Sequence, residues 1–358
     1  MRTNALVSIV SAAVWLPPDR DSAESAVAEQ RVEEKTARDL GHPRLPVAQD
    51  VSAPEMAVLA AREALRLGGV AAADTTLLLH AWMHYQGHDL WSPPHYIAHQ
   101  LGAHNTVPVG IQQICNGGAA ALELAAARLA MLSGLSVPSV LSVGSGPRHA
   151  LITTADRFTE PGFDRWRSDY GAAYGDAATA VLLRAPADPD DPLLLRALHT
   201  VAAPHLEAMH RGTDPFARLP RENSSMVDMR RTKRAYLGEH GAAPFKKVNE
   251  EMIQRVVRGA LDDAGLAADD PRIRFVLLPR LGRRMLDGAW IPTLRDLVAA
   301  PAVRWGSDTG HLGTGDLPAG LHEVLRRPAL GPGDIGLLLN AGAGFTWSCA
   351  VVEAPAAR

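Results

Sequence analysis

The hydrophobic residues of this chain fall into two recurring patterns. Some form short uninterrupted runs, which are typical of buried strands, and others recur every three or four positions, which is typical of amphipathic helices. Strands that alternate with helices predict an α/β protein in which helices separate mixed sheets. The patterns predict strands over 5–13, 76–80, 137–143 and 177–183, helices over 55–67, 94–101 and 117–132, and loop-rich stretches over 19–50 (with a short helix) and 84–96.

The second half of the chain repeats the first at an offset of 196 residues. Glu55-Met56 recurs at this offset as Glu251-Met252, and the glycine-containing helix end that follows recurs as well. Because one offset persists through a helix, its cap and the next loop, we expect two copies of one α/β unit, residues 1–188 and 189–358. Residues 199–247 interrupt the repeat, and we expect this excursion to cross the surface and help to roof the site.

A cysteine lies at the turn between a strand and a long helix. Cys115 follows a β-type run, and Gly117-Gly118 open an Ala/Leu-rich helix. The positive end of the helix dipole favours a thiolate, and the glycines let a substrate approach the backbone. This arrangement suits a nucleophile that attacks an acyl group, with backbone N–H groups to hold the oxyanion. The alternative is a small buried residue at a tight turn. The repeat offset maps Cys115 onto His311.

Composition narrows the functional classes. The net charge of −3 gives no electrostatic case for nucleic acid. The two cysteines do not suggest a disulfide framework and favour a reducing, cytoplasmic location. The short N-terminal apolar run predicts a first strand rather than a signal peptide, and no run is long enough to span a membrane. The 14 histidines are scattered without a metal-binding motif, so we expect neither a metal nor another cofactor.

Three motifs carry a family resemblance. They are Ile114-Cys115-Asn116-Gly117-Gly118, Tyr174-Gly175-Asp176-Ala177, and the segment from Asn340 to Trp347. Together with the repeat, they resemble the thiolase superfamily, and most closely ketoacyl-acyl carrier protein synthase III. The resemblance covers nearly the whole chain. It implies a thiolase-like α/β fold of two duplicated halves in five layers, αβαβα. Members of this family are usually homodimers.

The resemblance also assigns residues of the site. The glycine-rich terminal loop, with Gly342, Gly344 and Phe345, would contact substrate. The backbone N–H groups of Cys115 and Ala343 would form the oxyanion hole. The acyl donor would be the thioester of coenzyme A or of an acyl carrier protein.

Two other catalytic residues of the family are replaced in this chain. The family places a histidine after a proline at a strand end, where this chain has Leu278-Pro279-Arg280. It places an asparagine in the loop before the last long helix, where this chain has His311. The family uses that His/Asn pair to stabilise the enolate left by malonyl decarboxylation. The replacements therefore argue against decarboxylative condensation.

The remaining groups form a coherent alternative. Cys115 and His311 in contact would give a thiolate–imidazolium pair, and Asp316 could orient the imidazole as in a catalytic triad. Asp316 also fits a helix N-cap, and the two roles are compatible. His311 could instead be a loop histidine on the surface. The Cys/His/Asp pattern resembles a branch of the synthase III family in antibiotic pathways, including cervimycin-type malonyl transfer, which moves acyl groups without extending a chain.

We therefore expect an acyltransferase that passes an acyl group through Cys115 to a hydroxyl or amine of a sugar or polyketide. A malonyl group is one candidate, because Arg280 could hold its free carboxylate with two parallel hydrogen bonds. A surface ion pair is the alternative role for Arg280. Two other functions stay open: a decarboxylating condensing enzyme, and a non-catalytic partner subunit, which would not need Cys115.

The excursion contains a basic run, Arg230-Arg231-Thr232-Lys233-Arg234. Such a run is usually a solvated helix face. The functional alternative is a contact with the phosphates of coenzyme A or of an acyl carrier protein.

Overall fold

The computed structural model describes residues 7–134 and 147–356, so the strand predicted over 137–143 lies outside the described residues. The strands are β1 (Ser8–Trp15), β2 (Asp19–Ser22), β3 (Arg44–Val47), β4 (Thr75–Ala81), β5 (Val107–Ile111), β6 (Arg148–Asp156), β7 (Ala177–Ala185), β8 (Leu193–Ala202), β9 (Ile273–Leu277), β10 (Ala302–Val303), β11 (Ile335–Gly342) and β12 (Thr346–Glu353). The α-helices are α1 (Ala23–Ala28), α2 (Glu34–Leu40), α3 (Ala53–Gly68), α4 (Pro93–Leu101), α5 (Gly117–Gly134), α6 (Ala208–Arg211), α7 (Met229–His240), α8 (Ala243–Ala264), α9 (Arg283–Met285), α10 (Ile291–Arg295) and α11 (Asp316–Arg326).

The sheet is built from two halves of matching order. Its strands run β10-β9-β11-β12-β8-β1-β7-β6-β4-β5, and β8 and β1 join the halves through a short antiparallel contact. On either side of that contact, two antiparallel strand pairs are followed by parallel pairing toward the edge. Strands from the first half of the chain thus form one side, and strands from the second half form the other.

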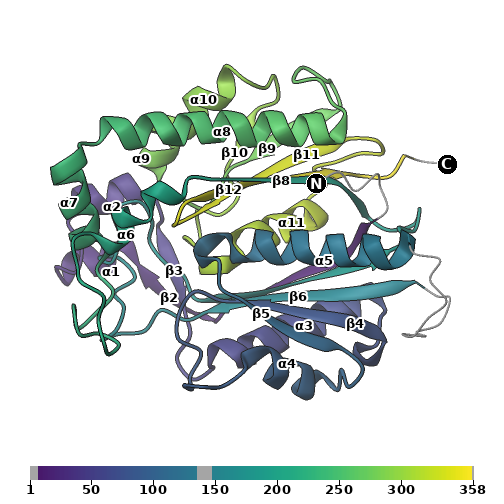
Figure 1. Ribbon diagram of the computed structural model, residues 1–358, viewed down its shortest axis with the longest axis horizontal. Helices are drawn as coiled ribbons and strands as arrows, with labels where there is room; N and C mark the ends of the chain where they lie inside the picture. Colours follow the sequence, from purple (N-terminus) through teal and green to yellow (C-terminus); the bar gives the residue numbers. More distant parts are fainter. Residues whose placement is uncertain (1–6, 135–146, 357–358) are drawn as a thin grey trace.

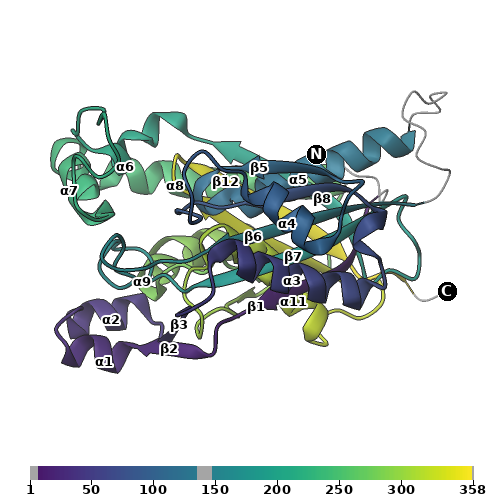
Figure 2. The same cartoon turned by 90° about the horizontal axis from the view of Figure 1, so that it is seen from below.

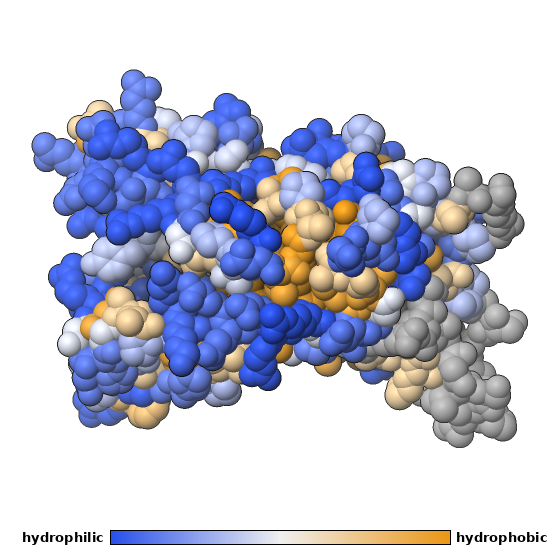
Figure 3. All heavy atoms as spheres, turned by 90° about the horizontal axis from the view of Figure 1, so that it is seen from above, coloured by the Kyte–Doolittle hydropathy of each residue, from blue (hydrophilic) through white to orange (hydrophobic). Residues whose placement is uncertain are grey.

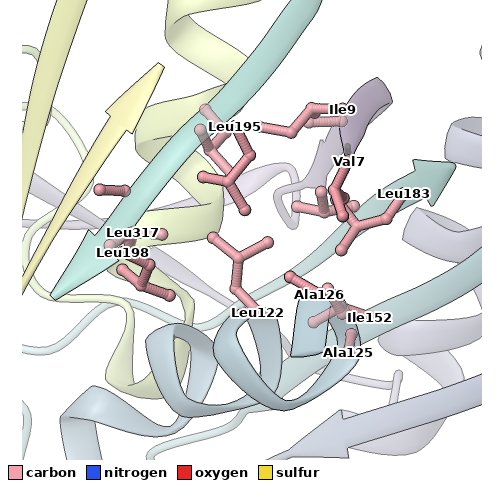
Figure 4. Packing of buried hydrophobic residues seen from close by; sticks show 14 of the residues in the cluster. Val7, Ile9, Leu122, Ala125, Ala126, Ile152, Leu183, Leu195, Leu198 and Leu317 are labelled. Atoms are coloured by element: carbon pink, nitrogen blue, oxygen red, sulfur yellow. The ribbon is translucent and has the colours of Figure 1, made fainter. Parts of the chain in front are cut away.

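The elements stack in five layers, as predicted (Figure 1). Helices α8 and α10 cover one outer face, α3 and α4 cover the other, and α5 and α11 lie between the two halves of the sheet (Figure 1). Seen from below, α3 and α4 lie in front of the sheet (Figure 2). The faces of the middle helices that meet the strands are apolar. Leu122 of α5, Leu317 of α11, Ile152 of β6 and Leu195 of β8 belong to one buried cluster (Figure 4).

Local signals explain where the helices begin and end. Ser52 and Glu55 form a capping box at the start of α3, and Gly69 ends this helix in the left-handed conformation. Gly265 ends α8 in the same way, at the position that the repeat predicted. The predicted helices over 55–67, 94–101 and 117–132 are all present, with ends shifted by a few residues.

The sequence patterns missed several elements. Strands β6 and β8 were not predicted. Residues 19–50 contain the antiparallel pair β2–β3, with two short helices between the strands, rather than a loop with one helix. Leu45 of β3 and other buried residues of this region pack with Trp166, from a later segment, in a small separate core. That core is assembled from segments far apart in the chain, so no local periodicity reveals it.

The repeat offset is wrong by three residues at the functional turns. A 3-10 turn, Ile114–Asn116, precedes α5, and the equivalent turn, Gly313–Gly315, precedes α11. The structural counterpart of Cys115 is therefore Thr314, and His311 lies three residues earlier.

The described helices include none that is long and apolar enough to cross a membrane.

One face of the molecule is largely polar, with an apolar area near its centre (Figure 3).

Candidate active site

The cysteine turn is fixed by hydrogen bonds from the last sheet strands. Asn340 of β11 donates from Nδ2 to the carbonyl oxygen of Cys115 and to Oδ1 of Asn116, each at 3.0 Å. Asn116 in turn donates to Ser348 Oγ of β12 at 2.8 Å. Ile114 adopts a positive φ of 45°, which turns the chain sharply before the helix. The second half of the molecule thus holds the turn that carries Cys115 in the first half.

The two central helix starts meet at a glycine. A Cβ added to Gly118 would lie 2.4 Å from the carbonyl oxygen of Thr314 and 2.8 Å from Cδ of Pro318. A Cβ on Gly117 would lie 2.9 Å from the Thr314 side chain. Only glycine permits this approach, which brings the cysteine turn against the loop that carries His311.

His311 and Asp316 form a buried pair. His311 Nδ1 lies 2.6 Å from Asp316 Oδ2, and both side chains are almost fully buried. Asp316 Oδ1 accepts the backbone N–H of Leu312 at 2.8 Å, and Oδ2 accepts that of Arg280 at 3.2 Å. Asp316 is the first residue of α11 and accepts these N–H groups from outside the helix, so it anchors the His311 loop rather than serving as the predicted N-cap.

Electrostatics favour the charged form of both members of this pair. Burial opposes ionisation of His311, but interactions with Asp316 and Cys115 raise its pKa well above the usual 6.5. Burial likewise opposes ionisation of Asp316, but His311, Arg280 and the Leu312 N–H lower its pKa below 3.8. The Asp316 carboxylate and the Cys115 side chain therefore both stabilise the imidazolium form of His311.

The two cysteines have different surroundings. Cys115 lines the cavity, and its Sγ lies 3.9 Å from Met83 Sδ. Cys349 is fully buried in β12, and burial raises the pKa of its thiol to about 12. A neutral, inaccessible thiol is a poor nucleophile, so the reactive candidate is Cys115.

A neighbouring loop holds His311 from the other side. The backbone N–H of His311 donates to Ala173 O at 2.8 Å, and Gly175 N–H donates back to His311 O at 2.9 Å. The ring of Tyr174 packs edge-on against the imidazole, with centroids 5.2 Å apart. The Tyr174-Gly175-Asp176 motif thus positions the histidine, while Asp176 itself pairs with Arg165.

Asp156 connects the first half of the molecule, which carries Cys115, to the loop that carries His311. Its carboxylate accepts the backbone N–H groups of Met83 and His84 at 2.8 and 2.9 Å, and both the N–H and the hydroxyl of Thr314 at 3.0 Å. It is completely buried, and burial raises its pKa to about 6 against the effect of these donors. Sequence reasoning missed this residue, although an aspartate at the end of an apolar strand was a usable signal.

Most of the predicted site residues line one cavity of about 480 Å³. These are Cys115, His311 and the loop residues Gly342, Ala343, Gly344 and Phe345. A Cβ on Gly342 would lie 2.6 Å from the backbone nitrogen of Asn116, so the terminal loop passes directly beside the cysteine turn. Asp316 lies behind His311, and the oxyanion role of Cys115 and Ala343 stays a prediction.

The excursion forms much of the cavity wall. Residues Met209, His210, Met229, Lys233, Leu237 and Phe245 line the cavity together with Met83, Phe163, Met285, Trp290 and Trp347. The roof predicted over 199–247 is therefore present. Sequence reasoning did not identify these wall residues, because methionines and aromatics in a long connection look like ordinary core residues.

The basic run is occupied by internal contacts. Arg230 donates to the carbonyl oxygens of Asp169 and Trp166, and Lys233 pairs with Asp169 at 2.5 Å. Arg231 pairs with Asp214, and Arg234 donates to the Tyr170 hydroxyl. These contacts fasten α7 to the body of the protein, so the run acts as structural support for the roof.

Arg280 lies outside the cavity that holds Cys115. Its guanidinium donates to Thr309 Oγ1 at 2.7 Å and lines a separate cavity, while its backbone supports Asp316. The turn at the end of β9 directs the Arg280 side chain toward Gly306. A Cβ added to Gly306 would lie 2.3 Å from Nη1 of Arg280. This position gives no support to the predicted contact with a donor carboxylate, and it is not the surface ion pair considered as the alternative.

A metal centre has no structural basis in the part of the chain that is described. Within residues 7–134 and 147–356, no three His, Cys, Asp or Glu side chains gather as a metal site would require.

Comparisons with known proteins place this geometry in a family. The model of the C-terminal part of 3-oxoacyl-[acyl-carrier-protein] synthase III matches residues 261–354. The β-ketoacyl-[acyl-carrier-protein] synthase III of Rhizorhabdus wittichii is 25% identical over 302 residues, 83% of each chain. The priming β-ketosynthase of the R1128 polyketide pathway has a TM-score of 0.74 at 20% identity, over 98% of this chain and 97% of that one, and shows the shared fold.

A more similar structure is that of ChlB3, which is described as an acyltransferase. It is 32% identical to this chain, covers 98% of both chains and superposes with a TM-score of 0.83. The fold is thus thiolase-like, and the chain belongs to the ketoacyl-acyl carrier protein synthase III-like family of the thiolase superfamily.

Proposed function

We propose that this protein is an acyltransferase that moves an acyl group from a coenzyme A or carrier-protein thioester to a hydroxyl or amine of a small molecule. The observation that carries the proposal is the buried chain from Asp316 through His311 to the Cys115 cavity. The similarity to ChlB3 supports the same reading. A role in antibiotic or other secondary metabolism, with a sugar or polyketide acceptor, is part of the proposal.

The first half-reaction loads the enzyme. The Cys115 thiolate attacks the thioester carbonyl carbon and forms a C–S bond, and the carbonyl electrons move to oxygen. Collapse of this intermediate breaks the donor C–S bond, and the His311 imidazolium gives its proton to the departing thiolate. The N–H groups of Cys115 and Ala343 would stabilise the oxyanion.

The second half-reaction uses the neutral imidazole that loading leaves behind. His311 removes a proton from the acceptor hydroxyl, whose oxygen attacks the acyl carbon and expels the Cys115 thiolate. The thiolate–imidazolium pair is then restored. Asp316 holds the tautomer with the proton on Nδ1, so that Nε2 can act as the base.

The cavity wall indicates the class of acceptor. Methionine and aromatic side chains dominate the wall, and methionine adapts to irregular apolar shapes. The main polar cluster is Asp169, Lys233 and His210, close beneath α7. We propose an acceptor with an extended apolar body and few polar groups, as a polyketide has.

A decarboxylating condensing enzyme is the second candidate. His84 and His210 also line the cavity, and burial lowers their pKa to about 4 and about 3, so both are neutral. Either could stabilise an enolate if it lay beside the bound acyl group. A third possibility, a non-catalytic partner subunit, is disfavoured by the intact buried pair.

Product analysis separates these functions. With radiolabelled malonyl-coenzyme A, the transferase should load Cys115 without releasing labelled CO₂, whereas the condensing enzyme should release it. A panel of acyl donors, read by intact mass, identifies the acyl group. Release of CO₂ that accompanies formation of a carbon–carbon bond would contradict the proposed acyltransferase function.

We also propose a homodimer. Strand β5 is the last strand at one end of the sheet, and Val107 and Val109 expose 47% and 37% of their surface there. Ile114 and Leu124 expose apolar surface in the adjoining turn and helix. An apolar sheet edge is a surface for pairing with another chain, and a second copy would cover it.

A further inference from the structure

A second cavity of about 90 Å³ lies behind the catalytic pair. Its lining includes three arginines, Arg280, Arg283 and Arg304, together with His42 and Ser307, and no aspartate or glutamate is among its lining residues in the described chain. Leu281 lines both this cavity and the larger one, so the two are neighbours. We call it the arginine cavity.

Arg280 lacks an ion-pair partner among the described residues. Only 9% of it is exposed, and its guanidinium donates to the neutral Thr309 hydroxyl. Gly306 leaves room for it, since any Cβ there would collide with the guanidinium. The carboxylates of Asp316 and Glu323 attract this charge, but neither forms an ion pair with the guanidinium, and a buried charge is costly unless an opposite charge pairs with it. Arg304 is already paired with Asp287, and Arg283 donates to the carbonyl of Arg38.

His42 supplies a polar atom of the opposite kind. It is 5% exposed, and its Nδ1 lies 3.0 Å from the carbonyl oxygen of Ser307. A carbonyl can only accept, so Nδ1 carries the proton. Burial lowers the pKa of His42, so the ring is neutral, and Nε2 is then a buried acceptor without a partner. Such an atom calls for a donor.

We propose that the arginine cavity binds a small oxyanion that also carries an O–H group, of which hydrogen phosphate is the simplest. Its charged oxygens accept from the Arg280 guanidinium, and its hydroxyl donates to His42 Nε2. The volume suits one tetrahedral anion and is far too small for coenzyme A. The bound anion holds the loop whose backbone N–H supports Asp316.

The test is anion binding to the full chain near pH 7, at constant ionic strength balanced with chloride. Calorimetry should show one saturable site for phosphate, and phosphate should raise the unfolding temperature. Sulfate, which has no proton to donate at this pH, should bind more weakly. Arg280→Met should weaken binding of both anions at least tenfold. His42→Phe should weaken phosphate binding and leave sulfate binding nearly unchanged.

Two variants serve as controls. Arg274→Met removes an exposed arginine that lies 3.6 Å from Asp334, and Cys115→Ala alters only the larger cavity; both should bind phosphate like the wild type. The proposal is overturned if wild-type protein shows no saturable response to phosphate beyond that to chloride. It is equally overturned if Arg280→Met binds phosphate normally, or if Cys115→Ala abolishes binding. If a variant does not fold, the comparison of phosphate, sulfate and chloride binding to the wild-type protein still tests the proposal.

Discussion

At the scale of single residues, the proposed mechanism needs His311 as a proton donor in the first half-reaction and as a proton acceptor in the second. In the proposed mechanism, His311 is charged beside the Cys115 thiolate during loading and neutral when an acceptor arrives. Acylation of Cys115 removes the negative charge that helps to raise the His311 pKa, and the departing thiol takes the proton. The change of protonation state therefore follows from the chemistry of loading.

The pair His311 and Asp316 gives the first prediction. His311→Ala should slow transfer by about 10²- to 10⁴-fold, the usual worth of a general base, and Asp316→Asn should cost less. Because the Asp316 carboxylate raises the His311 pKa, its removal should move the alkaline limb of the acylation rate to lower pH. Steady-state transfer assays measure the loss of rate, and stopped-flow loading across pH measures the shift of the alkaline limb. A His311→Ala enzyme with the wild-type transfer rate would overturn the triad and turn attention to His84.

The sequence predicted several residues that the structure brings together at the candidate site. Cys115 follows from the motif at its turn, and Asp316 follows from its short spacing to His311. His311 itself came from the family resemblance and from a repeat offset that is wrong by three residues. The direction of the Arg280 side chain was not predictable, because Gly306 and Thr309 decide it from another segment. The wall residues His210 and Lys233 were missed for the same reason.

At the scale of elements, the close approach of α5 and α11 determines the site. The sequence predicted α5 over 117–132 and placed His311 in the loop before a last long helix, but the three-residue shift between the two turns depends on the folded arrangement. A Cβ on Gly118 would collide with Thr314 and Pro318, so a substitution there must displace one of the two helix starts.

The second prediction concerns this contact. Gly118→Ala should destabilise the protein by about 1–3 kcal/mol, the usual cost of overpacking, and slow loading of Cys115. Gly238→Ala is the matched control, because a Cβ there meets no atom within 4 Å on α7. The control should be neutral or stabilised by about 0.5–1 kcal/mol. Urea unfolding measures both variants, and equal stability of the two would contradict the packing argument.

At the scale of the whole molecule, buried polar groups connect the two halves across the site. Asp156 is the clearest example, since it joins the end of β6 to the loop before α11. Its pKa of about 6 lies above that of an aspartate in an unfolded chain.

The third prediction follows from that pKa. Between about pH 4 and 6 the folded protein keeps a proton on Asp156 that the unfolded chain releases, so the free energy of unfolding should fall as pH rises through this interval. The change is up to about 3 kcal/mol. Asp156→Asn, which cannot titrate, should lose this part of the pH dependence. Chemical unfolding from pH 4 to 7 tests it, and an unchanged slope in the variant would refute the assignment.

The fourth prediction concerns the β5 edge. Val109→Lys places a charge on the exposed edge and should convert the dimer to a monomer or weaken it strongly. Leu67→Lys, at the far end of α3 and 51% exposed, is the control and should stay dimeric. Light scattering after gel filtration measures the mass. A monomeric wild type, or a dimeric Val109→Lys, would contradict the interface.

The central claim is that Cys115 carries the acyl group between donor and acceptor. The most direct measurement is intact-mass spectrometry after incubation with a panel of acyl-coenzyme A donors, followed by peptide mapping. The account predicts an added acyl mass on the peptide that contains Cys115, its loss on addition of an acceptor, and no adduct in a folded Cys115→Ala variant. An adduct on the buried Cys349, or transfer by Cys115→Ala at the wild-type rate, would contradict it.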